Sequence, residues 1–192
     1  MVPSSGNTHN FYNIFKEIEM SIDALKDMLP AYAKDMRLNL SNVLSEAGAE
    51  GLTEKQIAAI AVAVSLSTRS KALIENIEAF AAPILTEEEL NGAKIAFSIM
   101  SMNNIYYRFV HLTSNQEYAT IPARLRMNSM ANPGIDKVTF ELASMAVSAV
   151  NGCGMCLDSH EKNLRDHGVT TQAIQSSVRI AAVLFSVGAT LN

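Results

Sequence analysis

The chain has 192 residues, enough for one domain with a full hydrophobic core. Its net charge of −4 arises from scattered charges of both signs, without a basic run or an acidic tail, so neither nucleic acid nor an anionic lipid surface is an expected partner. Apolar residues make up 48% of the chain although Trp is absent, which favours a helical protein that leaves some apolar surface for an oligomer interface.

Almost every segment of the chain is predicted to be helical. In chain order the predicted helices cover residues 10–28, 32–44, 53–66, 70–80, 87–101 or slightly beyond, 136–150, 153 onward, and 170 to the C-terminus. The pairs Thr53/Gln56 and Thr86/Glu89 form capping boxes at two helix starts, and Asp136 caps a third. The segment between the fifth and sixth helices, from residue 103 to 133, is expected to be looser. Because no segment alternates polar and apolar residues with the period of a strand, the predicted fold class is all-α.

The chain also contains a faint internal repeat. A shift of 83 residues overlays the third predicted helix on the sixth. We expect a degenerate unit over about 52–103 and an active unit over about 135–188, both inside a single domain over 20–192. Residues 1–19 are assigned to an N-terminal extension, disordered or helical.

Targeting and membrane-spanning segments are not expected. The first ten residues are polar and lack the basic start and apolar core of a signal peptide. The longest uninterrupted apolar stretches, such as 57–66, are shorter than the ~18 residues that span a bilayer. The two cysteines are too close together to form a secretory disulfide framework, and a lone CxxC pair in a cytosolic chain is more often redox-active or metal-binding. We therefore expect a cytoplasmic protein without membrane contact.

Both cysteines lie in one short stretch together with a histidine. On a helix, Cys153, Cys156 and His160 stand at i, i+3 and i+7 and share one face. If the break at 151–152 folds the flanking helices into a hairpin, Glu141 comes within about one turn of His160. Because a carboxylate on this apolar helix is costly without a partner, we expect Glu141 to join the three residues in space. The corresponding positions of the first unit hold Ser70, Leu73, Ile77 and Ala58.

Two thiols, an imidazole and a carboxylate in this arrangement can support peroxide chemistry. The attacking species is the thiolate, which a helix N-terminus and a nearby imidazolium both favour. A carboxylate beside the imidazole can orient the ring and pass protons. Attack on a peroxide gives a sulfenic acid, which a second thiol three residues away converts to a disulfide. A dithiol must then reduce that disulfide by exchange.

Other interpretations of these residues stay open at this point. Cysteines on a core-facing helix are often inert small hydrophobes. Cys, His and Glu are also zinc ligands, although structural zinc sites usually draw ligands from two separated segments. The order of attack is open as well, because the helix dipole alone would favour the thiolate at Cys153, which is nearer the N-terminus.

The reactive residues also match a known family. Its hallmark is Glu, a CxxC pair twelve residues later and His four residues after the second cysteine, as in Glu141, Cys153, Cys156 and His160. Further likeness lies in the segments 20–22, 29–35, 102–108, 125–128, 131–134, 140–142 and 146–153. The chain therefore resembles the AhpD-like alkyl hydroperoxide reductases, within the carboxymuconolactone decarboxylase-like family.

The resemblance implies an AhpD-like helical fold of two pseudo-repeated units, assembled as a homotrimer. It implies an antioxidant peroxidase for organic hydroperoxides with no bound cofactor and no metal. Dihydrolipoamide on a dihydrolipoyl-bearing acyltransferase subunit would re-reduce the Cys153–Cys156 disulfide, and the enzyme would also regenerate the peroxiredoxin AhpC. By position, Cys156 would be the peroxidatic residue that becomes sulfenic acid. Cys153 would be the resolving thiol, a proton donor and the cysteine exposed to the reductant, while Glu141 and His160 would form the proton relay.

One position departs from the family pattern. AhpD-like sequences often carry His directly before the second cysteine, where this chain has Met155, and a thioether cannot relay protons. The alternatives to a peroxidase are a general thiol–disulfide oxidoreductase with weak peroxidase activity and a non-enzymatic, zinc-binding trimeric module. A decarboxylase is not expected, because that branch of the family does not rest on a CxxC pair.

Overall fold

The computed structural model describes residues 21–192, and the predicted extension over 1–19 lies outside that part. Residues 21–28 are helical, whereas the earlier part of the helix predicted over 10–28 is not among the described residues. The later elements are the 3-10 turn η1 (Ala31–Ala33), α2 (Lys34–Val43), α3 (Glu54–Thr68), α4 (Lys71–Ala81), α5 (Glu87–Leu112), the 3-10 turns η2 (Gln116–Ala119) and η3 (Asn128–Ala131), α6 (Lys137–Asn151), α7 (Gly154–Asp166) and α8 (Thr171–Leu191). No strand occurs in this described part, and the all-α class is confirmed.

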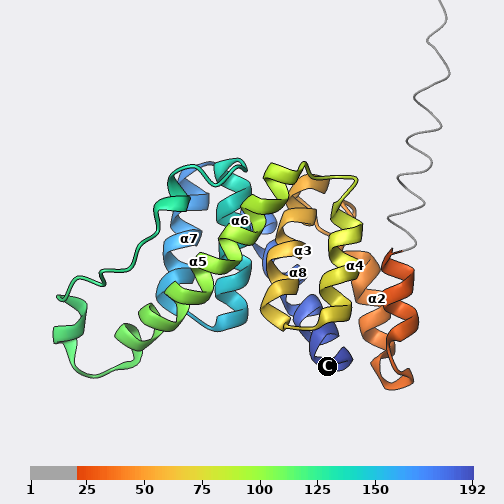
Figure 1. Cartoon of the computed structure of the whole chain (residues 1–192), viewed down its shortest axis with the longest axis horizontal. Coiled ribbons are helices and arrows are strands. Elements are labelled where there is room, and N and C mark those ends of the chain that lie inside the picture. The colour runs from red at the N-terminus through yellow and green to blue at the C-terminus, as the bar shows by residue number, and fades with distance from the viewer. Residues whose placement is uncertain (1–20) are drawn as a thin grey trace, which may run out of the picture.

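Helices α3 and α6 form the centre of the bundle. α3 packs against α4, α5, α6 and α8, and α6 packs against α3, α5, α7 and α8. Because neighbours surround them, both helices are apolar on nearly every side and not along one stripe. Figure 1 shows α5 running across the bundle, with α6 and α7 toward one end and α3, α4 and α2 toward the other.

The helix starts follow the capping residues found in the sequence. Thr53 and Thr86 form capping boxes at the starts of α3 and α5, and the side chain of Asp136 accepts a hydrogen bond from the backbone N–H of Thr139 at the start of α6. The segment predicted as one helix over 32–44 instead begins with the 3-10 turn η1, which follows Pro30, and continues as α2.

The end predicted for α5 is wrong. The helix was expected over 87–101 or slightly beyond but continues to Leu112, so the start of the segment expected to be loose is helical. No glycine or proline interrupts this stretch. Its polar residues Asn103 and Asn104 are buried, with Asn104 bonded to α6, which explains why a polar segment remains helical here.

Helix α8 is long and apolar enough, by length and composition alone, to cross a membrane, with a mean hydropathy of 1.4 over its most apolar window. The sequence prediction considered only uninterrupted apolar runs, whereas serines and threonines are scattered through α8. In the fold α8 packs against α2, α3 and α6, and residues such as Ile180 and Leu184 are completely buried. α8 is therefore apolar because part of its surface packs in the core of the bundle.

The positions that match the reactive residues in the predicted first unit lie in the core. Ser70 is the N-cap residue of α4, and Leu73, Ile77 and Ala58 are completely buried. α3 and α4 begin 83 residues before α6 and α7, which equals the offset of the predicted repeat. The division into a degenerate and an active unit stays a prediction.

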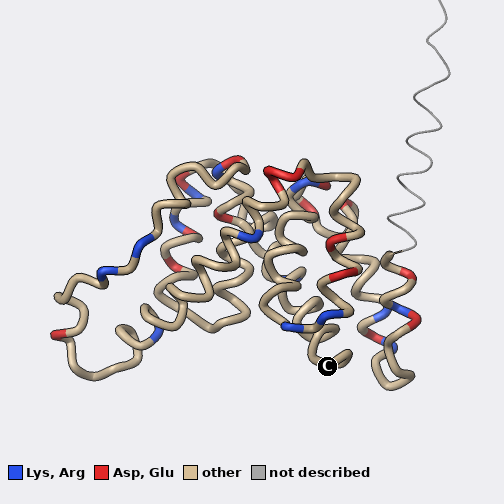
Figure 2. The backbone as a smooth tube through the Cα atoms, in the orientation of Figure 1, with Lys and Arg blue, Asp and Glu red and all other residues tan. Residues whose placement is uncertain are grey.

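The segment between α5 and α6 projects away from the bundle (Figure 1). It carries exposed apolar side chains, including those of Leu112 and Ile121, and the ring of Tyr118 packs on Phe109 with centroids 4.9 Å apart. Figure 2 shows that Lys and Arg alternate with Asp and Glu along much of the bundle.

Candidate active site

A tight turn joins α6 to α7. Gly152 has a φ of 65°, in the left-handed region that glycine adopts without strain. The backbone N–H of Gly152 donates to the carbonyl of Ala149, and that of Cys153 to the carbonyl of Ser148, both at 3.2 Å. This is the hydrogen-bond pattern of a Schellman motif, which ends α6 and turns the chain back on itself.

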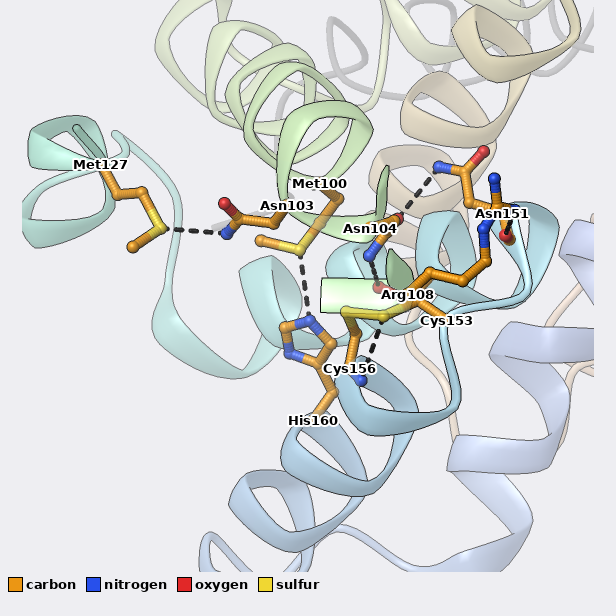
Figure 3. Close-up of a disulfide and its surroundings, with 10 residues drawn as sticks. Met100, Asn103, Asn104, Arg108, Met127, Asn151, Cys153, Cys156 and His160 are labelled. Carbon is orange, nitrogen blue, oxygen red and sulfur yellow. Dashed lines mark hydrogen bonds between the residues drawn. A yellow bond between two sulfur atoms is a disulfide. The ribbon is translucent and has the colours of Figure 1, made fainter. Parts of the chain in front are cut away.

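A disulfide joins Cys153 and Cys156 at the first turn of α7 (Figure 3). Cys153 is the N-cap residue, and its Sγ accepts a hydrogen bond from the backbone N–H of Cys156 at 3.3 Å. The expectation that Cys153 is the exposed cysteine is wrong: it is completely buried, because the capping position directs its sulfur over the helix end and not outward. Cys156 is 8% exposed and lines a pocket. Among residues 21–192, no group of three or more His, Cys, Asp or Glu is placed to hold a metal ion.

The hairpin brings Glu141 of α6 against His160 of α7. Glu141 Oε2 lies 2.7 Å from His160 Nδ1, and the two side chains are only 10% and 8% exposed. Burial acts to raise the pKa of Glu141, but the hydrogen bond and charge of His160, the side chain of Asn163 and the charge of Lys137 outweigh it and lower the pKa overall. The carboxylate is therefore ionised at neutral pH.

A pocket of about 290 Å³ opens beside Cys156 and His160. One wall is a stripe on α5, where Met100, Asn103 and Tyr107 stand at i, i+3 and i+7. The other residues that line it are Met127, Met130, Glu141, Met155, Ser159 and Asn163. Its four methionines make the pocket largely apolar and adaptable in shape, and Cys156, Glu141 and His160 lie in its wall.

Met155 occupies the position between the cysteines where the family pattern often has His. Its side chain lines the pocket and is 37% exposed, unlike the buried cysteines that flank it. A thioether accepts hydrogen bonds weakly and donates none. The position therefore adds apolar surface to the pocket but no proton carrier.

A chain of polar contacts ties α5 to the turn that carries Cys153 (Figure 3). Asn104 Nδ2 donates to Ser148 Oγ, and Asn151 Nδ2 donates to Asn104 Oδ1, both at 2.9 Å. Arg108 Nη1 donates to the carbonyl of Asn151 at 2.6 Å. Sequence reasoning gave these α5 residues no role, because it ended the helix too early. The signal available was the absence of glycine and proline from residues 102–112, which lets the helix continue.

Known proteins match this chain over its site and most of its length. Residues 116–192, which include both cysteines, match the profile of the Carboxymuconolactone decarboxylase family. The chain is 55% identical over 173 residues to the alkyl hydroperoxide reductase AhpD of Rhodopseudomonas palustris (strain BisA53), covering 90% of this chain and 94% of that protein. It is 52% identical over 172 residues to the protein of the same name from Maricaulis maris (strain MCS10), covering 90% and 98%. For that from Coxiella burnetii (strain Dugway 5J108-111) the identity is 53% over 163 residues, covering 85% and 92%.

Proposed function

The chain belongs to the AhpD family of alkyl hydroperoxide reductases, and from that membership we propose that it reduces organic hydroperoxides at the Cys153–Cys156 dithiol. The observation that carries the proposal is the convergence on one pocket of Cys156 and the buried, hydrogen-bonded Glu141–His160 pair. A pocket lined by methionines suits the organic part of such a substrate.

Cys156 is the attacking residue, because its sulfur lines the pocket while that of Cys153 does not. Its thiolate attacks the terminal oxygen of the hydroperoxide. The S–O bond forms as the O–O bond breaks, and the sulfur is oxidised to a sulfenic acid. The alkoxide that leaves takes a proton from His160, whose ring Glu141 orients, and departs as the alcohol.

Cys153 is the resolving residue. Its thiolate attacks the sulfur of the sulfenic acid, the disulfide forms, and hydroxide leaves and is protonated to water. The backbone N–H of Cys156 and the N-terminus of α7 both stabilise negative charge on Cys153 Sγ.

Reduction of the disulfide needs an external dithiol, and protein-bound dihydrolipoamide is the proposed donor. Its first thiolate attacks Cys156, because Cys153 is buried, and Cys153 leaves as the stabilised thiolate. The second lipoyl thiol then closes the lipoyl disulfide and frees Cys156. Regeneration of the peroxiredoxin AhpC follows the same exchange in the opposite direction, with the reduced enzyme as donor.

A homotrimer is the proposed assembly, and the cytoplasm is the proposed compartment. The segment that projects between α5 and α6 exposes Leu112 and Ile121 to solvent in the single chain, and Ile105 on α5 is 58% exposed. Exposed apolar side chains of this kind favour contact with another copy. A reducing compartment suits a dithiol that must return to the thiol form in every cycle.

The experiment is stopped-flow oxidation of the reduced protein by one equivalent of cumene hydroperoxide, followed by thiol titration. Wild type should lose two thiols per chain, whereas Cys156→Ser should lose none on the same timescale. If wild type keeps its thiols with peroxide but oxidises them rapidly with a small disulfide, the chain is a general thiol–disulfide oxidoreductase and the proposal fails.

A further inference from the structure

Met100 contacts His160 on the side of the ring that faces away from Glu141. Met100 Sδ lies 3.3 Å from Nε2 of His160, the contact drawn in Figure 3, while Glu141 Oε2 lies 2.7 Å from Nδ1. Met100 is on α5 and only 2% exposed, so the surrounding core fixes its sulfur. Both ring nitrogens therefore face a group that accepts hydrogen bonds.

These two partners determine where the ring hydrogens lie. A thioether sulfur has no hydrogen and can only accept, so in a hydrogen bond between the two groups Nε2 is the donor. The ionised carboxylate of Glu141 can also only accept, so Nδ1 must donate to it. We propose that Met100 is a positioning residue that holds His160 as an imidazolium, with one proton kept on Nε2 in the wall of the peroxide pocket. This role of Met100 rests on the proposed peroxidase function.

A sulfur acceptor suits a proton that must later be given away. Because an N–H···S contact is weak, a hydroperoxide oxygen can take the place of Met100 Sδ at little cost. When the O–O bond breaks, the Nε2 proton moves to the alkoxide, and the ring becomes a neutral imidazole that still donates Nδ1–H to Glu141. Both electrons of the oxidation come from Cys156, so Met100 itself is unchanged.

Few other titratable groups face this ring. α6 contributes Glu141 and, through its effect on that carboxylate, Lys137, and α5 contributes Tyr107. The two cysteines of α7 are joined in a disulfide and do not titrate in this state. Of the side chains that line the pocket, Glu141 is the only acid that is ionised at neutral pH. Removal of the sulfur acceptor should therefore remove the hydrogen from Nε2, because no other ionised acid in the pocket can hold it there.

Two substitutions of similar size separate the acceptor from the packing. Met100→Leu keeps the apolar volume and removes the acceptor, whereas Met100→Gln keeps an acceptor at similar reach and reduces the apolar character. Met145→Leu is the matched control, since it removes a buried sulfur from α6 that does not line the pocket. A packing role predicts that Leu is tolerated and Gln is harmful, and an acceptor role predicts the reverse.

The first measurement is ¹⁵N NMR of the His160 ring at neutral pH, in the oxidised full-length protein and without peroxide. Wild type and Met100→Gln should show hydrogen on both nitrogens, and Met100→Leu should lose it from Nε2. In stopped-flow oxidation at neutral pH, Met100→Leu should react about fivefold more slowly than wild type, which is the effect of one weak hydrogen bond. The difference in rate should shrink as pH falls, because protons from solvent restore the imidazolium. Met100→Gln should oxidise faster than Met100→Leu, and Met145→Leu should stay within about twofold of wild type.

A bare ring nitrogen in wild type, or a Gln variant slower than the Leu variant, would overturn the proposal. If the proposed peroxidase function fails, wild type shows no loss of thiols with peroxide, whatever the NMR experiment shows. The two failures can therefore be told apart.

Discussion

Replacement of Glu141 by Gln removes the charge of the relay and keeps its shape. The Oε2–Nδ1 distance of 2.7 Å is at the short end for a charge-assisted hydrogen bond, and the pair is buried. Gln can still accept from Nδ1, so the bond becomes a neutral one that is weaker by about 1.5 kcal/mol. If that difference appears fully in the transition state, oxidation of Cys156 slows about tenfold.

The assay is stopped-flow thiol oxidation by an organic hydroperoxide at neutral pH. Glu161→Gln is the matched control, because Glu161 is next to His160 in sequence but exposed. It should oxidise at the wild-type rate. A Glu141→Gln variant that keeps its helical circular dichroism and also oxidises at that rate would refute the relay, as would an equal loss in the Glu161 variant.

Three more expectations concern the turn between α6 and α7, the pocket, and the stability of the protein at acid pH. Arg108→Met should lower the free energy of unfolding in urea by about 2 kcal/mol, because the carbonyl of Asn151 loses a charged donor, whereas exposed Arg126→Met should change it little; equal losses would contradict this. Met155→His should speed thiol oxidation severalfold in stopped flow by placing a proton carrier in the pocket. An unchanged rate would place this residue outside the proton path. Because the pKa of Glu141 is lowered in the fold, its ionised form stabilises the protein fully above the ordinary value of 4.5, and this contribution is lost as pH falls through the lowered value. In thermal melts the advantage of wild type over Glu141→Gln should shrink as the solution is acidified, and a constant gap would show that the carboxylate does not contribute in this way.

Sequence reasoning succeeded where local chemistry decides the structure. Capping residues such as Thr53 and Asp136 satisfy backbone N–H groups within one turn, so their helix starts can be found without the fold. The proximity of Glu141 to His160 follows from one tight turn at Gly152 and the periodicity of two helices, which are also local properties.

The features that the sequence did not predict depend on distant contacts. Asn104 is 44 residues from Ser148, its partner, so its burial and the full length of α5 depend on packing against α6. Met100 is 60 residues from His160, and nothing in its own segment marks it as a neighbour of the relay. The exposure of Cys153 likewise depends on how the turn directs one side chain, which spacing alone does not fix.

The central claim, that Cys156 attacks the peroxide, is tested most directly in Cys153→Ser, which cannot close the disulfide. Treatment with one equivalent of cumene hydroperoxide, trapping with dimedone and peptide mass spectrometry should locate one sulfenic acid per chain on Cys156. The absence of a trapped product, or sulfenic acid forming on Cys153 at an equal rate in Cys156→Ser, would contradict the account.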